Sequence, residues 1–146
     1  QISQNFIYRG WDVNTSGNPY AHTILRGSTN KYGRSRPNYH YEDLMKLYDM
    51  YGERNLKNPA TIVDANHANS DKQFKEQIRI VNEVLHSRSL SNDIRSLVKG
   101  VMIESYLVEG SQKIGCHPHI YGQSITDPCL GWEDSEKLLY EIAEKC

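Results

Sequence analysis

Three short apolar runs alternate along this chain with longer stretches whose apolar residues recur at helical spacing. The runs cover residues 22–25, 60–63 and 101–103, and their length and composition are typical of buried strands. A chain in which strands alternate with helices folds as a parallel sheet covered by helices. We therefore predict an α/β fold. Three strands leave open whether the sheet is an open doubly wound one or part of a closed barrel.

The stretches with helical spacing cover residues 41–51, 70–85 and 133–143. In the second of them Ser70 is followed three residues later by Gln73, which predicts a capping box at the start of that helix. The third begins with several acidic residues, which the positive end of the helix dipole stabilises. We therefore expect three helices that pack on the sheet.

The charge balance gives no support for a strongly charged partner such as nucleic acid. The 146 residues include 17 Lys and Arg and 18 Asp and Glu, so the formal net charge is -1. This balance gives no reason to expect nucleic acid or an anionic membrane as a partner, and no apolar run approaches the ~18 residues that span a bilayer. The length suits one domain with a core of its own, not two.

The cysteines and the first residues indicate a compartment. Cys116, Cys129 and Cys146 are an odd number without CxxC spacing, so neither a disulfide framework nor a cysteine zinc site is expected and a reducing cytoplasm fits best. The segment 1–5 has no features of a secretory signal and no starting Met. We therefore expect a cytoplasmic protein from which an upstream part is missing.

A polar residue able to bind or react follows each predicted strand. Arg26, His67 and Glu104 come after the first, second and third apolar runs, at intervals of 41 and 37 residues. Barrels and open α/β sheets both place their sites at the carboxyl ends of the strands. A barrel of about 250 residues contains roughly 31 per strand–helix unit, so this chain would hold three of eight units and be a fragment.

Each of these residues also has an ordinary structural explanation. Arg26 precedes a glycine and suits a carboxylate or phosphate, but it is equally explained as an ion-paired arginine at a strand end. His67 either binds a metal or moves a proton, or is a hydrogen-bonded loop histidine. Asp64 either supports His67 or caps the loop. Glu104 ends a strand expected to be buried, so its carboxylate needs a partner.

Asp127 completes a possible metal site. On its own, an aspartate before a proline explains a turn. Together with His67 and Glu104 it makes a nitrogen-and-oxygen ligand set suited to one divalent ion such as Mn, Fe, Co or Zn. We expect these three ligands at three consecutive strand ends. The cluster in residues 116–119, with one Cys and two His, is interpreted as a loop in which any metal binding is adventitious.

Seven blocks of the sequence resemble the microbial-type (class I) 3-deoxy-7-phosphoheptulonate synthases. They stand in the family's order, with near-family spacing, from about residue 13 to the end. The last two are long and specific. The blocks are residues 14–18, 24–27, 67–70, 72–74, 100–105, 107–110 and 121–133.

The resemblance implies an enzyme that condenses phosphoenolpyruvate with D-erythrose 4-phosphate and releases phosphate. It implies a (β/α)₈ TIM barrel, of which residues 1–146 supply about units 6 to 8, and an inactive isolated fragment. Carried over by position, His67, Glu104 and Asp127 are metal ligands, and Arg26 holds phosphoenolpyruvate. We expect Arg26 and His67 to be catalytic, and these two with Glu104 to touch substrate. The fourth ligand would be a cysteine outside this chain, in the missing N-terminal part.

Some positions depart from the family pattern. The family commonly has Gly and Lys where this chain has Ser28 and Thr29, and Ser where it has Asn66. A local cation is therefore missing, which leaves a non-catalytic regulatory paralogue that binds a partner synthase as the alternative. For an authentic synthase we also expect a homo-oligomer.

Overall fold

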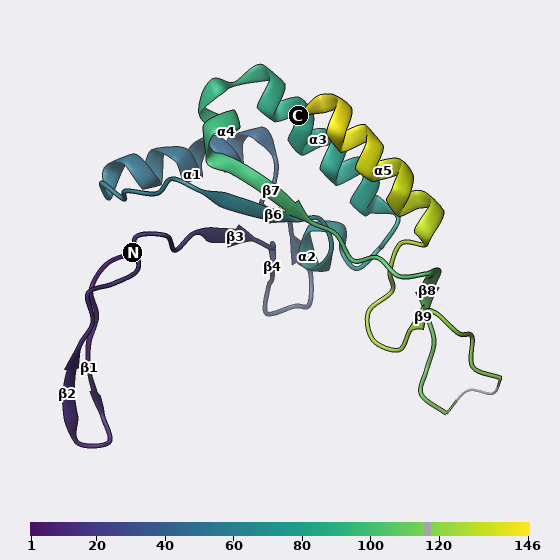
Figure 1. The fold of residues 1–146 in the computed structure, drawn as a ribbon, viewed down its shortest axis with the longest axis horizontal. Coiled ribbons are helices and arrows are strands. Elements are labelled where there is room, and N and C mark those ends of the chain that lie inside the picture. The colour runs from purple at the N-terminus through teal and green to yellow at the C-terminus, as the bar shows by residue number, and fades with distance from the viewer. Residues whose placement is uncertain (116–117) are drawn as a thin grey trace.

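A parallel three-stranded sheet forms the centre of the molecule. The computed structural model describes residues 1–115 and 118–146. Strands β3 (Thr23–Leu25), β6 (Thr61–Asp64) and β7 (Val98–Met102) pair in the order β3-β6-β7, and both pairings are parallel. Each strand thus lies beside its neighbour in the series, with helical connections between them (Figure 1). The predicted α/β fold is confirmed.

The two faces of this sheet have different surroundings. Leu25 pairs with Val63, which pairs with Val101, and this row packs on the hydrophobic core. The neighbouring row begins with Ile24, which is 50% exposed, because no described element of this chain covers that face. The prediction that residues 22–25 form a buried strand is therefore wrong for the face of the strand that carries Ile24, which is exposed.

Four longer helices lie together on the covered side of the sheet (Figure 1). They are α1 (Tyr41–Glu53), α3 (Glu76–Leu90), α4 (Asn92–Leu97) and α5 (Trp132–Lys145). Their inner positions form the core, whose residues Leu44, Ile80, Val84, Ile94 and Leu138 are at most 1% exposed. Burial of each such side chain contributes about 1.5–3 kcal/mol, so this packing fixes the orientation of the strands.

The second helical stretch is split into two helices. A short helix α2 (His67–Ser70) ends where Asp71 and Lys72 take positive φ values of 53° and 60°, and α3 begins only at Glu76. The predicted capping box is wrong, since the Ser70 hydroxyl donates to Asn66 Oδ1 instead, at 2.7 Å. The reversal at residues 71–72 allows α2 to stand over the strand ends while α3 packs on the sheet.

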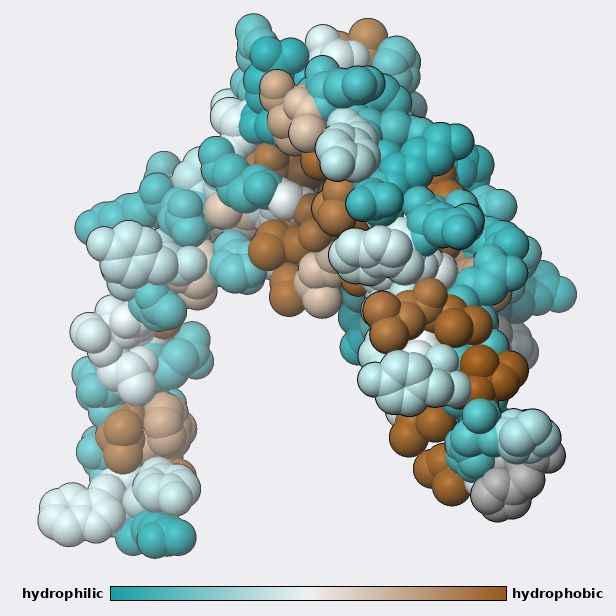
Figure 2. Space-filling model, turned by 45° about the vertical axis from the view of Figure 1, so that its right-hand side comes forward, coloured by the Kyte–Doolittle hydropathy of each residue, from teal (hydrophilic) through white to brown (hydrophobic). Residues whose placement is uncertain are grey.

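Short two-stranded pairs lie outside the central body. They are β1 (Asn5–Tyr8) with β2 (Trp11–Asn14), β4 (Ser28–Thr29) with β5 (Ser35–Arg36), and β8 (Val108–Ser111) with β9 (Gln123–Ser124). The β1–β2 hairpin and the β8–β9 region extend as two arms (Figure 1). Figure 2 shows apolar side chains exposed beneath the resulting arch and along the β8–β9 arm.

None of the helices in the described part of the chain has the length and apolar character needed to cross a bilayer.

Candidate metal centre

His67 stands just beyond the carboxyl end of β6 and is held there by Asp64. Its Nδ1 lies 2.8 Å from Asp64 Oδ2. The other carboxylate oxygen, Oδ1, accepts from the Asn66 backbone N–H at 2.9 Å, and Asp64 is only 2% exposed. Asp64 therefore both supports His67 and caps the loop. One of its carboxylate oxygens orients the imidazole, and the other accepts from the backbone of the turn that carries His67.

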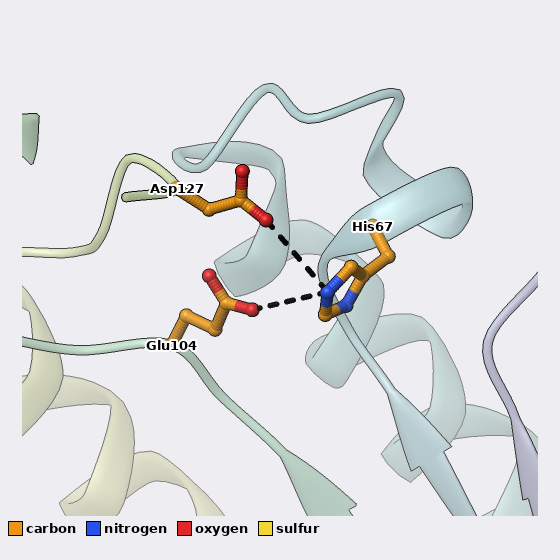
Figure 3. Close-up of side chains that lie close together, drawn as sticks. All are labelled: His67, Glu104 and Asp127. Carbon is orange, nitrogen blue, oxygen red and sulfur yellow. Dashed lines mark ion pairs between the residues drawn. The ribbon is translucent and has the colours of Figure 1, made fainter. Parts of the chain in front are cut away.

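The other ring nitrogen of His67 faces two carboxylates (Figure 3). Nε2 lies 3.4 Å from Glu104 Oε1 and 3.8 Å from Asp127 Oδ2. One ligand atom from each of these three residues lies within 4.8 Å of the other two. The structure thus brings together the three residues that the sequence singled out as a ligand set.

Glu104 lies two residues beyond the end of β7 and has the partners that the sequence required. Its Oε2 accepts from Asn66 Nδ2 at 2.9 Å. Its backbone N–H donates to Gln77 Oε1 at 2.8 Å, and its carbonyl accepts from Gln77 Nε2 at 3.2 Å. The side chain is 30% exposed, so the carboxylate reaches the surface of the site with Oε1 directed toward His67.

Asp127 reaches the site by a route that the sequence did not predict. It follows β9 and precedes α5, so it does not end a strand of the central sheet. The expectation of three ligands at three consecutive strand ends is therefore wrong. The long connection after β7 carries Glu104 outward and folds back through the bridges Ser105↔Leu130 and Gly110↔Cys129. This return places Asp127 beside the other two residues.

The donor set fits a divalent cation. When the Nδ1 proton of a neutral His67 is donated to Asp64, the lone pair of Nε2 points at two carboxylate oxygens. Three electron-rich atoms at this spacing repel one another unless a cation or a proton lies between them. Imidazole nitrogen with carboxylate oxygen is a ligand set of first-row divalent metals, and a carboxylate behind the imidazole is typical of metal-bound histidine.

Arg26 directly follows β3 and lines a cavity of about 520 Å³ together with His67, Lys72 and Asp127. Its Nε lies 3.9 Å from Asp64 Oδ2, and its side chain is 60% exposed. Lys72 Nζ lies 3.2 Å from Asp127 Oδ1. Two cationic side chains therefore share one cavity with two of the three candidate ligands, His67 and Asp127, whereas Glu104 lines the adjoining pocket on the other side of Asp127. The contact between Arg26 and Asp64 is too long for a hydrogen bond.

Cys129 lies near this centre without belonging to the three-residue group. Burial is the main cause that raises the pKa of the Cys129 thiol, so the thiol stays protonated at neutral pH and is a poor ligand. Cys129 and Cys146 are both free thiols. Cys116 and His117, in the segment 116–119 that was interpreted as a loop, lie outside the described residues.

The sequence reading missed three residues that touch the centre: Asn66, Lys72 and Gln77. One of them carried a signal. Gln77 stands three and four residues before Ile80 and Val81, on the apolar face of α3, and a polar residue on such a face requires a buried partner. Lys72 had no comparable signal, and Asn66 was named only as a departure from the family pattern, because each lies in an irregular segment.

Comparisons with known proteins identify the family of this chain. The model of the DAHP synthetase I family matches residues 2–140. The Trp-sensitive phospho-2-dehydro-3-deoxyheptonate aldolase of Escherichia coli strain K12 is 42% identical over 130 residues, which are 88% of this chain and 34% of the relative. The enzyme of the same name from Enterobacter agglomerans is 42% identical over 99% of this chain and 37% of the relative.

A solved structure shows the same similarity in three dimensions. The phospho-2-dehydro-3-deoxyheptonate aldolase of Francisella tularensis SCHU S4 superposes with a TM-score of 0.79 at 31% identity, over 98% of this chain and 40% of that one. The chain thus spans little more than a third of the length of these relatives. A family match over nearly all of its residues nevertheless shows that this chain belongs to the DAHP synthetase I family.

Proposed function

We propose that the complete protein is a metal-dependent 3-deoxy-7-phosphoheptulonate synthase. It would condense phosphoenolpyruvate with D-erythrose 4-phosphate to 3-deoxy-D-arabino-heptulosonate 7-phosphate and release phosphate, the first step of the shikimate pathway. The observation that carries this proposal is the convergence of His67 Nε2, Glu104 Oε1 and Asp127 Oδ2 in a chain matched by the family over residues 2–140.

We further propose that residues 1–146 are the C-terminal part of one (β/α)₈ barrel, about units 6 to 8. The sequential parallel order β3-β6-β7 suits neighbouring barrel strands. The face with the half-exposed Ile24 is apolar and uncovered, as the interior side of an incomplete barrel would be. The missing part of the barrel would then supply the fourth ligand, a cysteine, and further cationic residues. A homo-oligomer stays a prediction.

His67, Glu104 and Asp127 would hold the metal, which when bound polarises the aldehyde oxygen of erythrose 4-phosphate as a Lewis acid. Asp64 keeps Nδ1 of His67 occupied, so that Nε2 is the nitrogen available to the site. Glu104 and His67 also border the space in which substrate would lie. Their task is to present fixed donors before the substrate arrives, which lowers the cost of ordering the site.

Arg26 would bind phosphoenolpyruvate. Its guanidinium offers a planar fork of donors that matches a carboxylate or a phosphate. The side chain is mostly exposed in the same cavity as His67, so it is free to turn toward a ligand. With the substrate anchored there, C3 of phosphoenolpyruvate can be held against the aldehyde carbon, and such orientation supplies much of the rate enhancement.

The test is an assay of the complete protein with both substrates and Mn²⁺, in which phosphate release and metal content are measured together. We expect turnover, and we expect His67→Ala, Glu104→Ala and Asp127→Ala each to lower metal occupancy and activity in parallel. Glu133→Ala, an exposed acid at the start of α5, is the control and should change neither. A variant of the three that keeps full metal and a near-normal rate would remove that residue from the site.

One observation favours a second function. Ser28 and Thr29 line the cavity beside Arg26, at positions where the family commonly has a glycine and a lysine. A cavity with fewer cations binds phosphorylated substrates less strongly, which suits a non-catalytic paralogue that regulates a partner synthase. In the same assay such a protein would show no turnover alone and would change the rate of an added family synthase.

A further inference from the structure

Two buried amide side chains hold Glu104 from opposite directions. Asn66 precedes α2 and is 1% exposed, whereas Gln77 lies in α3 and is 0% exposed. A buried amide without hydrogen bonds destabilises the folded protein, so each of these two side chains needs a hydrogen-bond partner in the interior. Both find partners on Glu104.

Asn66 fixes the rotation of the Glu104 carboxylate. Its Nδ2 donates to Oε2 at 2.9 Å, while its Oδ1 accepts from the Ser70 hydroxyl at 2.7 Å. The reverse orientation of the amide would point Oδ1 at the carboxylate, where like partial charges repel. With Oε2 occupied in this way, Oε1 is the oxygen that faces His67 Nε2, at 3.4 Å.

Gln77 fixes the backbone of Glu104 just after the sheet ends. Its amide accepts from the Glu104 N–H and donates to the Glu104 carbonyl. Strand β7 ends at Met102, so the Gln77 amide binds the backbone groups of Glu104 in the way that a neighbouring strand would. The same carbonyl accepts from the N–H of Leu130 at 3.0 Å. Leu130 stands three residues after Asp127, so this backbone contact also ties down the returning segment that carries Asp127.

We propose that Asn66 and Gln77 form an amide clamp that positions Glu104 for metal binding. Gln77 sets the place from which the Glu104 side chain leaves the backbone, and Asn66 selects which carboxylate oxygen points into the centre. Side chains that orient metal ligands in this way typically change metal affinity or activity by about 10–100-fold when they are lost. The clamp rests on the proposed function, because it acts on a ligand of the same metal site.

Asn66→Ala is the variant that tests the clamp, since alanine has no side-chain donor to replace the amide contact with Glu104. Asn66→Leu is its companion, because leucine keeps the branched shape and leaves no cavity but has no donor. Asn82→Ala is the matched control: it makes the same chemical change on α3, where the Asn82 amide donates to Glu141 Oε2 at 3.0 Å. Glu104→Gln tests the ligand itself.

The measurement is the Kd for Co²⁺ of the complete metal-free protein, with the visible absorption of the bound Co²⁺ as a report on ligand geometry. We expect both Asn66 variants to raise the Kd at least about 10-fold and to alter the spectrum. The melting temperature of each metal-free variant, compared with that of Asn82→Ala, separates lost positioning from lost folding.

The clamp is wrong if Glu104→Gln binds Co²⁺ weakly while both Asn66 variants bind it as the unmodified protein does. If Glu104→Gln also binds Co²⁺ normally, the proposed metal site itself is wrong, and the clamp falls with it.

Discussion

His67 takes a backbone conformation that few residues of its size adopt, with φ at 45°. Asp71 and Lys72 follow with φ values of 53° and 60°, so three non-glycine residues within six lie in the left-handed region. Each costs on the order of 1–3 kcal/mol when the surroundings must enforce it. Such strain collects at functional sites, and here it places the imidazole over Asp64 while Lys72 turns toward Asp127.

Arg26→Lys tests the residue that we assign to substrate. The change keeps the charge but removes the planar fork, so we expect weaker phosphoenolpyruvate binding and nearly unchanged erythrose 4-phosphate affinity in the complete protein. The contact with Asp64 is 3.9 Å long and the side chain is 60% exposed, so stability without ligand should shift by less than about 1 kcal/mol.

Melting temperatures with and without phosphoenolpyruvate decide this prediction. A variant that melts much earlier without ligand, yet gains the normal increment when phosphoenolpyruvate is added, would show that Arg26 is a structural ion-pair residue.

At the scale of elements, the β4–β5 hairpin is attached to the strand ends by a close backbone approach. Gly27 leads into the hairpin with φ at +70°, and a Cβ built there would lie 2.9 Å from the backbone carbon of Ala68. Its N–H donates to Asn38 Oδ1 at 2.8 Å, and the Asn38 N–H donates to Asn69 Oδ1 at 2.9 Å. The hairpin therefore forms a wall of the Arg26 cavity because position 27 has no side chain.

Gly27→Ala and its matched control Gly33→Ala test the close approach of the β4–β5 hairpin to α2. Both glycines have positive φ, 70° and 75°, but a Cβ at Gly33 meets nothing within 4 Å. We expect Gly33→Ala to cost at most about 1–2 kcal/mol, the penalty of the left-handed backbone alone. Gly27→Ala should cost clearly more and should weaken phosphoenolpyruvate binding, because the hairpin must move away from α2. Urea unfolding and substrate titration of the complete protein measure both effects, and equal costs would contradict the close approach.

The whole molecule is an arch with one covered and one uncovered face. Helices pack on one side of the sheet (Figure 1), while apolar side chains such as Ile24, Met102 and Leu107 are between 42% and 55% exposed. Large apolar surfaces of this kind are unusual on an independent domain and mark contact with other protein. The uncovered face is where the remainder of the proposed barrel would pack.

The 146 residues on their own should therefore not catalyse the condensation. The chain carries three candidate ligands and one face of a site, and the proposed fourth ligand and further cations would come from elsewhere in the protein. Purified residues 1–146 with both substrates and Mn²⁺ should release no phosphate above the background. Turnover comparable to that of ordinary enzymes would show that the site is complete within this chain.

The strand–helix alternation and the residues at the strand ends were readable from the sequence, because apolar periodicity is a local property. It placed β6, α1 and α5 closely, and it singled out Arg26, His67 and Glu104 because each stands within a few residues of a predicted strand end. Asp127 entered the predicted ligand set by its chemical type, beside His67 and Glu104, and the family resemblance then implied the same role, which its turn-like surroundings alone did not indicate.

Only the tertiary structure decided how these residues meet. Asn66 and Gln77 touch Glu104 across 38 and 27 residues of chain, and Asp127 returns to His67 only when the connection after β7 folds back on itself. Such contacts depend on closing long loops against a packed core, and no local pattern records them. The sequence by itself determined which side chains are available for a metal centre, whereas the helix packing and the buried amides decided which of their atoms face one another.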